Sequence, residues 1–131
     1  MTCLHGKTAF ISGGSRGIGL AIAQRLAKDG VNLMISASNQ AHLEVVANDL
    51  QARSTARVSS HSGDLRSLAG CETAFAAHQD EYSVCDILIH SAGATKGGIF
   101  PTQPDEDFID GFALKFHAGV RLSRLFWPML K

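Results

Sequence analysis

The stretch that decides the fold is Ser12-Gly13-Gly14-Ser15-Arg16-Gly17-Ile18-Gly19. It follows the apolar run Thr8-Ala9-Phe10-Ile11 and precedes a segment of helical period. A strand, a glycine-rich turn and a helix in this order place backbone N–H groups at a helix N-terminus, where phosphate groups bind. The sequence therefore predicts that this segment holds the pyrophosphate of a dinucleotide.

Three glycines have separate mechanical tasks in this loop. Gly13 can adopt a positive φ, Gly17 lets the backbone approach phosphate oxygens, and Gly19 allows the helix to pack closely on the sheet. The spacing Gly-x-x-x-Gly-x-Gly contains no Gly-Lys-Ser/Thr, which disfavours a nucleoside triphosphatase. Taken alone, such glycines also fit a plain tight turn.

Strands and helices alternate outward from the loop. We expect strands at 7–12, 31–35, 56–61 and 86–90 and helices at 40–53, 68–82 and 104–130, after a first helix that closes at Gly30. One face of that first helix carries Ile18, Ala21, Ile22, Leu26 and Ala27. Residues Leu43, Val46, Ala47 and Leu50 have the same spacing in the second helix. This alternation predicts an α/β fold of Rossmann type, a doubly wound parallel sheet of strand order 3-2-1-4 in one domain over 1–131.

The far end of this pattern carries three further expectations. The unbroken apolar centre of 86–90 suits a strand covered on both faces. A glycine-rich loop follows at 93–101. The long helix after it starts near Pro104, carries Phe108, Phe112, Phe116 and Val120 along one side, and bends at Pro128.

Composition narrows the class of partner. The chain has 131 residues, of which 45% are hydrophobic, and 12 basic residues balance 12 acidic ones, so a globular domain of zero net charge is expected. No basic run is present to follow a nucleic-acid backbone. No signal-peptide or membrane-spanning stretch is apparent, and three cysteines without a Cys-x-x-Cys pair suit reduced thiols, so we expect a cytoplasmic protein without a membrane partner. The six histidines form no metal-ligand pair, and no metal site is predicted.

These motifs resemble those of the short-chain dehydrogenases/reductases. Residues 12–19 resemble that family's Thr-Gly-x-x-x-Gly-Ile-Gly, with Ser12 in place of Thr. Asp64 resembles its adenine-contacting Asp, and His90-Ser91-Ala92-Gly93 resembles its Asn-Asn-Ala-Gly turn. The end of the chain, 121–131, resembles the end of its long interface helix. The resemblance spans nearly the whole chain and implies hydride transfer between a nicotinamide cofactor and a small-molecule carbonyl or alcohol.

The expected cofactor is NADP(H), with NAD(H) as the alternative. An acid at the end of the second strand would bind a ribose 2′-hydroxyl and repel a 2′-phosphate, but Ala37 and Ser38 stand there. Arg16 lies where NADP-dependent relatives often carry a basic residue, although a solvated loop charge is its plainer reading. The missing acid also argues against a methyltransferase. The expected cofactor-binding residues are Gly13, Ser15, Arg16, Gly17, Ile18, Gly19, Ser38, Asp64, Leu65, His90, Ala92 and Gly93. His90 is equally well read as a hydrogen-bonded turn residue.

Catalysis is where the chain departs from the family. The resemblance implies a Ser and a Tyr-x-x-x-Lys beyond the long helix, whereas the one tyrosine, Tyr82, precedes the fourth strand and has Asp86 four positions on. The family's catalytic Asn aligns with Lys115, which could order a water or lie at a helix interface. We therefore expect the first part of a longer reductase, with little turnover alone and an exposed fourth-strand edge. The alternative is a non-catalytic dinucleotide-binding or association module, and homo-oligomers through the long helix are expected in either case.

Overall fold

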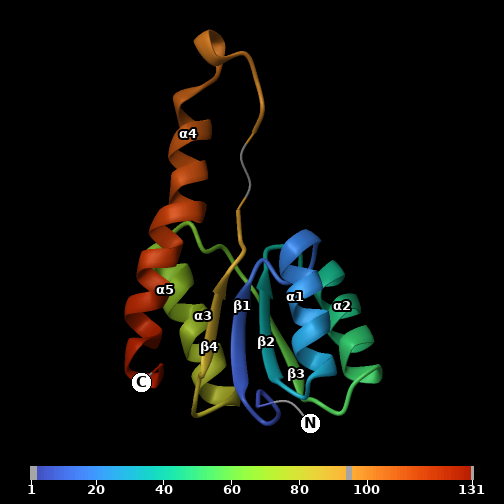
Figure 1. Ribbon diagram of the computed structural model, residues 1–131. Helices are drawn as coiled ribbons and strands as arrows, with labels where there is room; N and C mark the ends of the chain where they lie inside the picture. Colours follow the sequence, from blue (N-terminus) through green and yellow to red (C-terminus); the bar gives the residue numbers. More distant parts are fainter. Residues whose placement is uncertain (1–2, 94–95, 131) are drawn as a thin grey trace.

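Four parallel strands form one sheet of order β3-β2-β1-β4 (Figure 1). The computed structural model describes residues 3–93 and 96–130. The strands are β1 (Thr8–Ser12), β2 (Asn32–Ala37), β3 (Val58–Ser62) and β4 (Ile87–His90). The predicted strand order and Rossmann-type architecture are confirmed, and β3 lies slightly later in the chain than expected.

Two layers of helices cover the sheet because the side chains of β1 and β2 alternate between its faces. Ala9 and Ile11 pack with helices α1 (Gly17–Lys28) and α2 (Gln40–Ala52) on one face. Phe10 points to the other face, toward helices α3 (Leu68–Glu81) and α5 (Ala118–Phe126). The central strands are therefore buried on both sides, and their loops are held at one edge of the sheet (Figure 1).

An aromatic cluster fills the layer under α3 and α5. The ring centroid of Phe126 lies 4.9 Å from those of Phe10 and Phe75, and 5.0 Å from that of His78. Phe10, His78 and Phe126 have no exposed surface. This cluster fixes α5 against the sheet, which in turn sets the direction of the helix that precedes it.

The long segment after β4 is one path but not one regular helix. Helix α4 (Asp105–Phe112) is followed by a π-helical turn, Ala113–His117, and then by α5 and a 3-10 turn, Trp127–Met129. Pro104 caps α4 rather than starting it, and Pro128 lies in the 3-10 turn. The predicted single helix over 104–130 is therefore corrected, because one residue more per turn shifts the register at 113–117. The α4 part projects beyond the sheet, together with the short 3-10 turn Phe100–Thr102 (Figure 1).

Two predicted burial patterns need correction. In α1 the buried residues are Gly19, Ala23, Leu26 and Ala27, whereas Ile18 and Ala21 are exposed. The helix begins only at Gly17, so Ile18 lies in the first turn, beyond the edge of the sheet. Ile87 and Ile89 of β4 pack against the core on one face of the sheet and Leu88 packs against the core on the other, so the predicted cover on both faces is present but incomplete. These residues are half-buried because β4 is an edge strand, paired with β1 alone among the described strands. The face of α2 was predicted correctly.

Residues 94–95 of the expected 93–101 loop, and Lys131, lie outside the described part of the chain. Across 3–93 and 96–130, no helix is long and apolar enough to cross a membrane. The same residues contain no group of three His, Cys, Asp or Glu side chains that could hold a metal ion.

Candidate cofactor site

The glycine loop leaves β1 and packs its backbone against the turn after β4. Gly13 has φ +70°, and a Cβ there would lie 2.6 Å from the backbone nitrogen of Ala92. Gly19 faces the carbonyl oxygen of Gly13, which a Cβ at position 19 would overlap. Gly17 has φ +54° and nothing within 4 Å of the place a Cβ would occupy. Gly13 and Gly19 thus let chain segments pack closely, and Gly17 leaves an open surface.

The first turn of α1 faces this open surface, and its first N–H groups have no acceptor within 3–93 and 96–130. The helix begins at Gly17, so its first N–H groups have no intrahelical acceptor, and no acidic residue occupies the first turn. The side chain of Arg16, at the N-cap, makes no capping hydrogen bond and is exposed. Gly13 and Gly14 instead donate to the Ser36 carbonyl, at 2.8 and 3.2 Å. An anion at this helix end would meet free donors and the positive end of the helix dipole.

A histidine that the sequence reasoning missed ties the loop to α2. His42 Nε2–H donates to the carbonyl oxygen of Ser15, 3.0 Å away, and Ser15 itself is buried. The N–H of His42 in turn donates to the side chain of the N-cap residue Asn39, at 3.0 Å. Ser38 is exposed directly after β2. The contact places the end of β2 beside the glycine loop, and no local sequence pattern signals a pairing 27 residues apart.

After β3, Asp64 is exposed and Leu65 is buried. The guanidinium of Arg66 grips the Asp64 carboxylate, with Nη2 2.8 Å from Oδ2 and Nε 2.9 Å from Oδ1. These hydrogen bonds from Arg66 lower the pKa of Asp64 below its usual value. Gly70 lies beneath this loop, where a Cβ would overlap the Asp64 carbonyl oxygen. Neither Arg66 nor Gly70 was singled out from the sequence.

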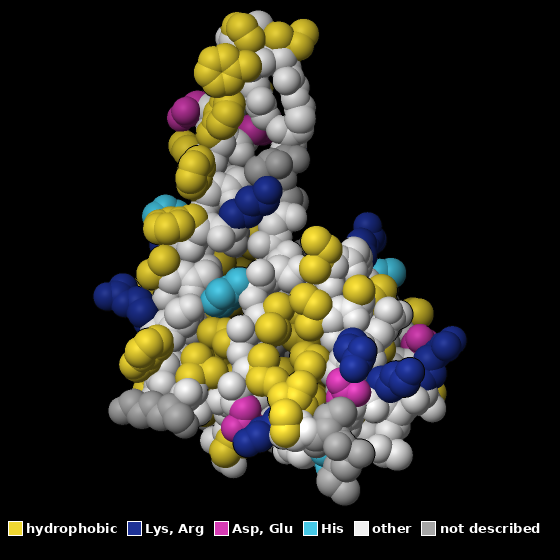
Figure 2. Space-filling model, viewed as in Figure 1, with side chains coloured by type: hydrophobic (Ala, Val, Ile, Leu, Met, Phe, Trp, Pro, Cys, Tyr) yellow, Lys and Arg dark blue, Asp and Glu magenta, His cyan; other side chains and the backbone are white. Residues whose placement is uncertain are grey.

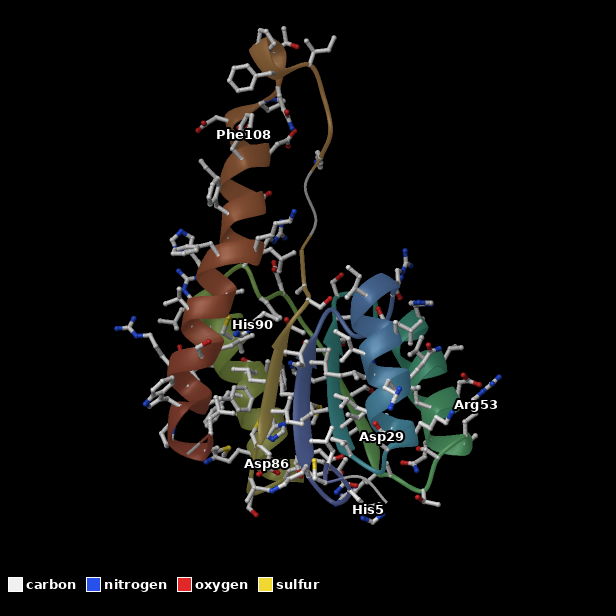
Figure 3. All side chains as sticks on the ribbon, viewed as in Figure 1. His5, Asp29, Arg53, Asp86, His90 and Phe108 are labelled. Atoms are coloured by element: carbon white, nitrogen blue, oxygen red, sulfur yellow. The ribbon has the colours of Figure 1, made fainter. Side chains whose placement is uncertain are left out.

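The turn after β4 is fastened to β1 by Ser12. Its hydroxyl oxygen accepts hydrogen bonds from the N–H groups of Ser91 (3.2 Å) and Ala92 (3.3 Å). His90 points instead toward α5, where its Nε2 lies 2.9 Å from the hydroxyl of Ser123 (Figure 3). Burial lowers the pKa of His90. This geometry favours the reading of His90 as a hydrogen-bonded turn residue, since its ring is directed to a helix.

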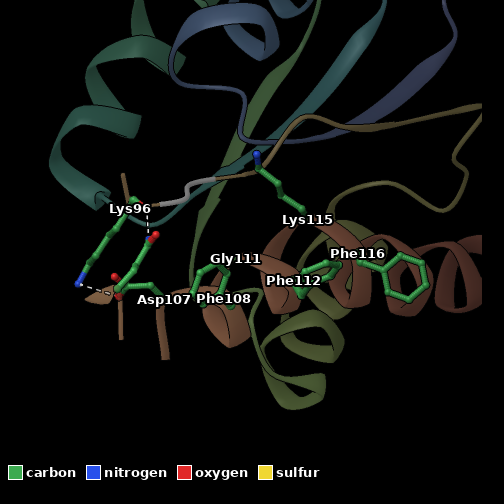
Figure 4. Close-up of a pocket in the computed structure, with 8 residues that line it drawn as sticks. Lys96, Asp107, Phe108, Gly111, Phe112, Lys115 and Phe116 are labelled. Carbon is green, nitrogen blue, oxygen red and sulfur yellow. Dashed lines mark hydrogen bonds and ion pairs between the residues drawn. The ribbon is translucent and has the colours of Figure 1, made fainter. Parts of the chain in front are cut away.

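Lys115 lies in the π-helical turn and leans over the exposed Gly93. A Cβ at Gly93 would lie 3.0 Å from the Cε atom of Lys115. Lys115 forms no ion pair with any residue of 3–93 or 96–130. It lines a pocket of about 370 Å³ between α4 and the preceding loop, whose other walls include Phe108, Phe112 and the ion pair of Lys96 with Asp107 (Figure 4).

Tyr82 has a structural environment. It is 8% exposed, and its hydroxyl donates to the carbonyl oxygen of Leu33, 2.9 Å away. Burial raises its pKa. It lies at the end of α3 that precedes β4, whereas the glycine loop and the turn at 91–93 follow the carboxyl ends of their strands. Tyr82 is therefore a packing residue and not an acid/base at this site.

Comparison with known proteins identifies the family. The family model described as short chain dehydrogenase matches residues 7–131. The chain belongs to the short-chain dehydrogenase family. It is 30% identical over 128 residues to D-beta-hydroxybutyrate dehydrogenase of Cupriavidus necator, covering 98% of this chain and 49% of that protein. It is 35% identical over 124 residues to 3-oxoacyl-[acyl-carrier-protein] reductase of Rickettsia bellii, covering 95% and 48%. The chain thus spans about half the length of these short-chain dehydrogenases.

Solved structures of short-chain dehydrogenases agree with the fold. L-sorbose reductase from Gluconobacter frateurii, complexed with NADPH and L-sorbose, superposes with a TM-score of 0.92 at 30% identity, over 97% of this chain and 48% of that one. An alcohol dehydrogenase from the archaeon Thermococcus sibiricus, complexed with 5-hydroxy-NADP, gives a TM-score of 0.89 at 27% identity, over 95% and 53%. The strand order and the helix after β4 are therefore those of short-chain dehydrogenase structures.

Proposed function

We propose that these 131 residues bind NADP(H) and form the cofactor half of an oxidoreductase that transfers hydride between nicotinamide and a carbonyl or alcohol carbon. The observation that carries the proposal is the cradle of Gly13 and Gly19, which no side chain could enter, beside the uncommitted first turn of α1. That cradle fits a pyrophosphate. When bound, the cofactor supplies the hydride.

Individual residues then have assigned tasks. Gly17, Ile18 and Gly19 present backbone N–H groups to the pyrophosphate, with Ser15 buried beneath the loop. Arg16 and Ser38 bind the 2′-phosphate, because an arginine matches phosphate geometry and no acid occupies 37–39 at the end of β2. Asp64 and Leu65 bind the adenine. His90, Ala92 and Gly93 line the nicotinamide side of the site at the turn after β4. The ring of His90 supports that turn through its hydrogen bond to Ser123 on α5.

Lys115 is proposed as the cation on the nicotinamide side. Its stem packs on Gly93 and its ammonium group is unpaired within the described residues, so it is free to donate to ribose or substrate oxygens. A carbonyl reduction also requires a proton donor. Tyr82 is buried and donates to the carbonyl oxygen of Leu33, so we assign the role of proton donor to no residue of 3–93 or 96–130.

A second function is favoured by a specific observation. The segment that runs from α4 through the π-helical turn and α5 to the 3-10 turn exposes Phe112 (65%), Phe116 (58%) and Trp127 (66%). An apolar surface of this kind marks an interface. The chain would then serve as a dinucleotide-binding and association module, with a second copy of the same helix as its partner.

Two measurements decide between these functions. The first is the dissociation constant of NADPH for the 131-residue chain, followed by nicotinamide fluorescence. No saturable binding would sink both proposals. The second is the intact mass of the native gene product with NADPH oxidation on a carbonyl panel. A mass well above 13.9 kDa with turnover supports the reductase. A mass of 13.9 kDa, with binding and no turnover, supports the module.

A further inference from the structure

Arg66, in the loop after β3, connects Asp64 of the same loop to helices α4 and α5. Arg66 donates to both carboxylate oxygens of Asp64 and, through Nη1, to Oδ2 of Asp110 on α4, 3.3 Å away. Its own carbonyl oxygen accepts from Nη1 of Arg121 on α5, at 3.2 Å. The backbone N–H of Arg66 also donates to Oδ1 of Asp64, at 3.0 Å. Residues from two helices thus converge on one loop.

This arrangement limits the motion of the Asp64 side chain. The forked guanidinium and the backbone N–H of Arg66 occupy acceptor positions on both carboxylate oxygens of Asp64. The remaining lone pairs of this exposed side chain stay available to a ligand. An exposed aspartate without such a clamp would rotate freely and would lose rotational freedom on binding a ligand. A carboxylate held in one orientation accepts hydrogen bonds only, and therefore selects a ligand that carries an N–H donor.

We propose that Arg66 is a positioning residue that orients Asp64 toward the exocyclic amine of adenine and anchors this end of the cofactor site to α4 and α5. The inference rests on the proposed function. It adds the residue through which the base is read: Arg66 touches no cofactor atom and acts through Asp64. Asp110 holds the guanidinium from the far side and has a smaller share in the same task.

The test compares NADPH with its hypoxanthine analogue, which carries an oxygen in place of the adenine amine. We expect the wild-type chain to bind NADPH about tenfold more tightly than the analogue, because the Asp64 carboxylate only accepts hydrogen bonds and would face an oxygen in the analogue. Arg66→Met should bind the two ligands within about twofold of each other. Arg66→Lys, which keeps the charge without the fork, should retain about half of the wild-type preference on a logarithmic scale.

Matched controls separate positioning from stability. Arg53→Met removes a comparably exposed pair with Asp49 on α2 and should leave the preference unchanged. Asp110→Asn should reduce the preference about twofold, and thermal melts of all variants show whether each is folded. A wild-type preference that persists in folded Arg66→Met overturns the inference. Equal wild-type affinity for the two ligands also overturns it and leaves the proposed function standing. Absence of binding to either ligand means that the proposed function itself has failed, and the inference with it.

Discussion

Gly17 and Gly19 are two positions apart, yet adding a methyl group would destabilise the fold for a different reason at each. At Gly19 it would overlap the Gly13 carbonyl, whereas at Gly17 it would meet open space in a left-handed conformation. We predict that Gly19→Ala lowers the free energy of unfolding by about 2–3 kcal/mol through overpacking. Gly17→Ala should lower it by only about 1 kcal/mol. Urea denaturation measures both, and equal losses would contradict the assignment of separate tasks.

NADPH affinity provides the second comparison for this pair. Gly17→Ala places a methyl group on the surface proposed to meet the pyrophosphate, so we expect affinity to fall at least tenfold in a chain that remains folded. An unchanged dissociation constant would show that the phosphate does not approach position 17.

The buried ring of His78 makes stability depend on pH. Its Nε2 hydrogen-bonds to the Val84 carbonyl at 2.9 Å, and burial lowers its pKa below 6.5. As the pH falls below about 6.5, position 78 therefore binds a proton more readily in the unfolded chain than in the folded chain. The free energy of unfolding should decrease from pH 7 to pH 5. Each extra proton contributes at most about 1.4 kcal/mol per pH unit.

The control variant is His78→Gln, which keeps a donor for Val84 without a titrating ring. Burial also lowers the pKa of His61 and of His90, so some pH dependence should survive in this variant. Urea titrations at several pH values measure the slope. An identical slope in the variant would mean that His78 does not carry the effect.

Helices α4 and α5, with the π-helical turn between them, expose large hydrophobic side chains that the rest of the described chain does not cover. Figure 2 shows hydrophobic side chains following the projecting segment from its tip downward. Phe108, Phe112 and Phe116 lie on this face, and the π-helical turn falls between its two halves. The sequence predicted the stripe correctly but not the turn, because apolar spacing alone does not distinguish a continuous helix from one that gains a residue in one turn.

We predict that this face drives association of the chain. Phe112→Glu combined with Phe116→Glu should shift the protein toward monomer, because charged groups are costly in an apolar interface. Val45→Glu is the matched control, since Val45 is 67% exposed on α2, away from this face. Sedimentation at several concentrations measures the equilibrium. A wild-type chain that is monomeric throughout would refute the association proposal.

For the molecule as a whole, the sequence was most informative where a pattern is local. The apolar runs and the glycine loop predicted the strand order, because parallel strands joined by right-handed crossovers allow few arrangements. The contacts of Ser15 with His42 and of Arg66 with Asp110 were not predicted, since they join residues 27 and 44 positions apart. Such pairings depend on how the loops fold at the sheet edge and have no local pattern.

Cofactor choice depends on the end of the sheet where the strands finish, because the loop after β1 and the end of β2 meet there. We predict that NADPH at 100 times its dissociation constant stabilises the chain by about 2.7 kcal/mol, which raises Tm by about 8–12 °C. NADH at the same concentration should stabilise it less. Ser38→Asp should reverse this order, because a carboxylate binds a ribose 2′-hydroxyl and repels a 2′-phosphate.

Ser83→Asp is the matched control. Ser83 is exposed and lies shortly before β4, at the end of the sheet where the strands begin. It adds the same charge to the chain but should leave the difference between NADPH and NADH unchanged. If Ser38→Asp and Ser83→Asp reduce NADPH stabilisation equally, net charge and not the local carboxylate is responsible. A reversal confined to Ser38→Asp places the 2′-phosphate at the end of β2, beside Arg16, and makes the missing acid the cause of the cofactor preference.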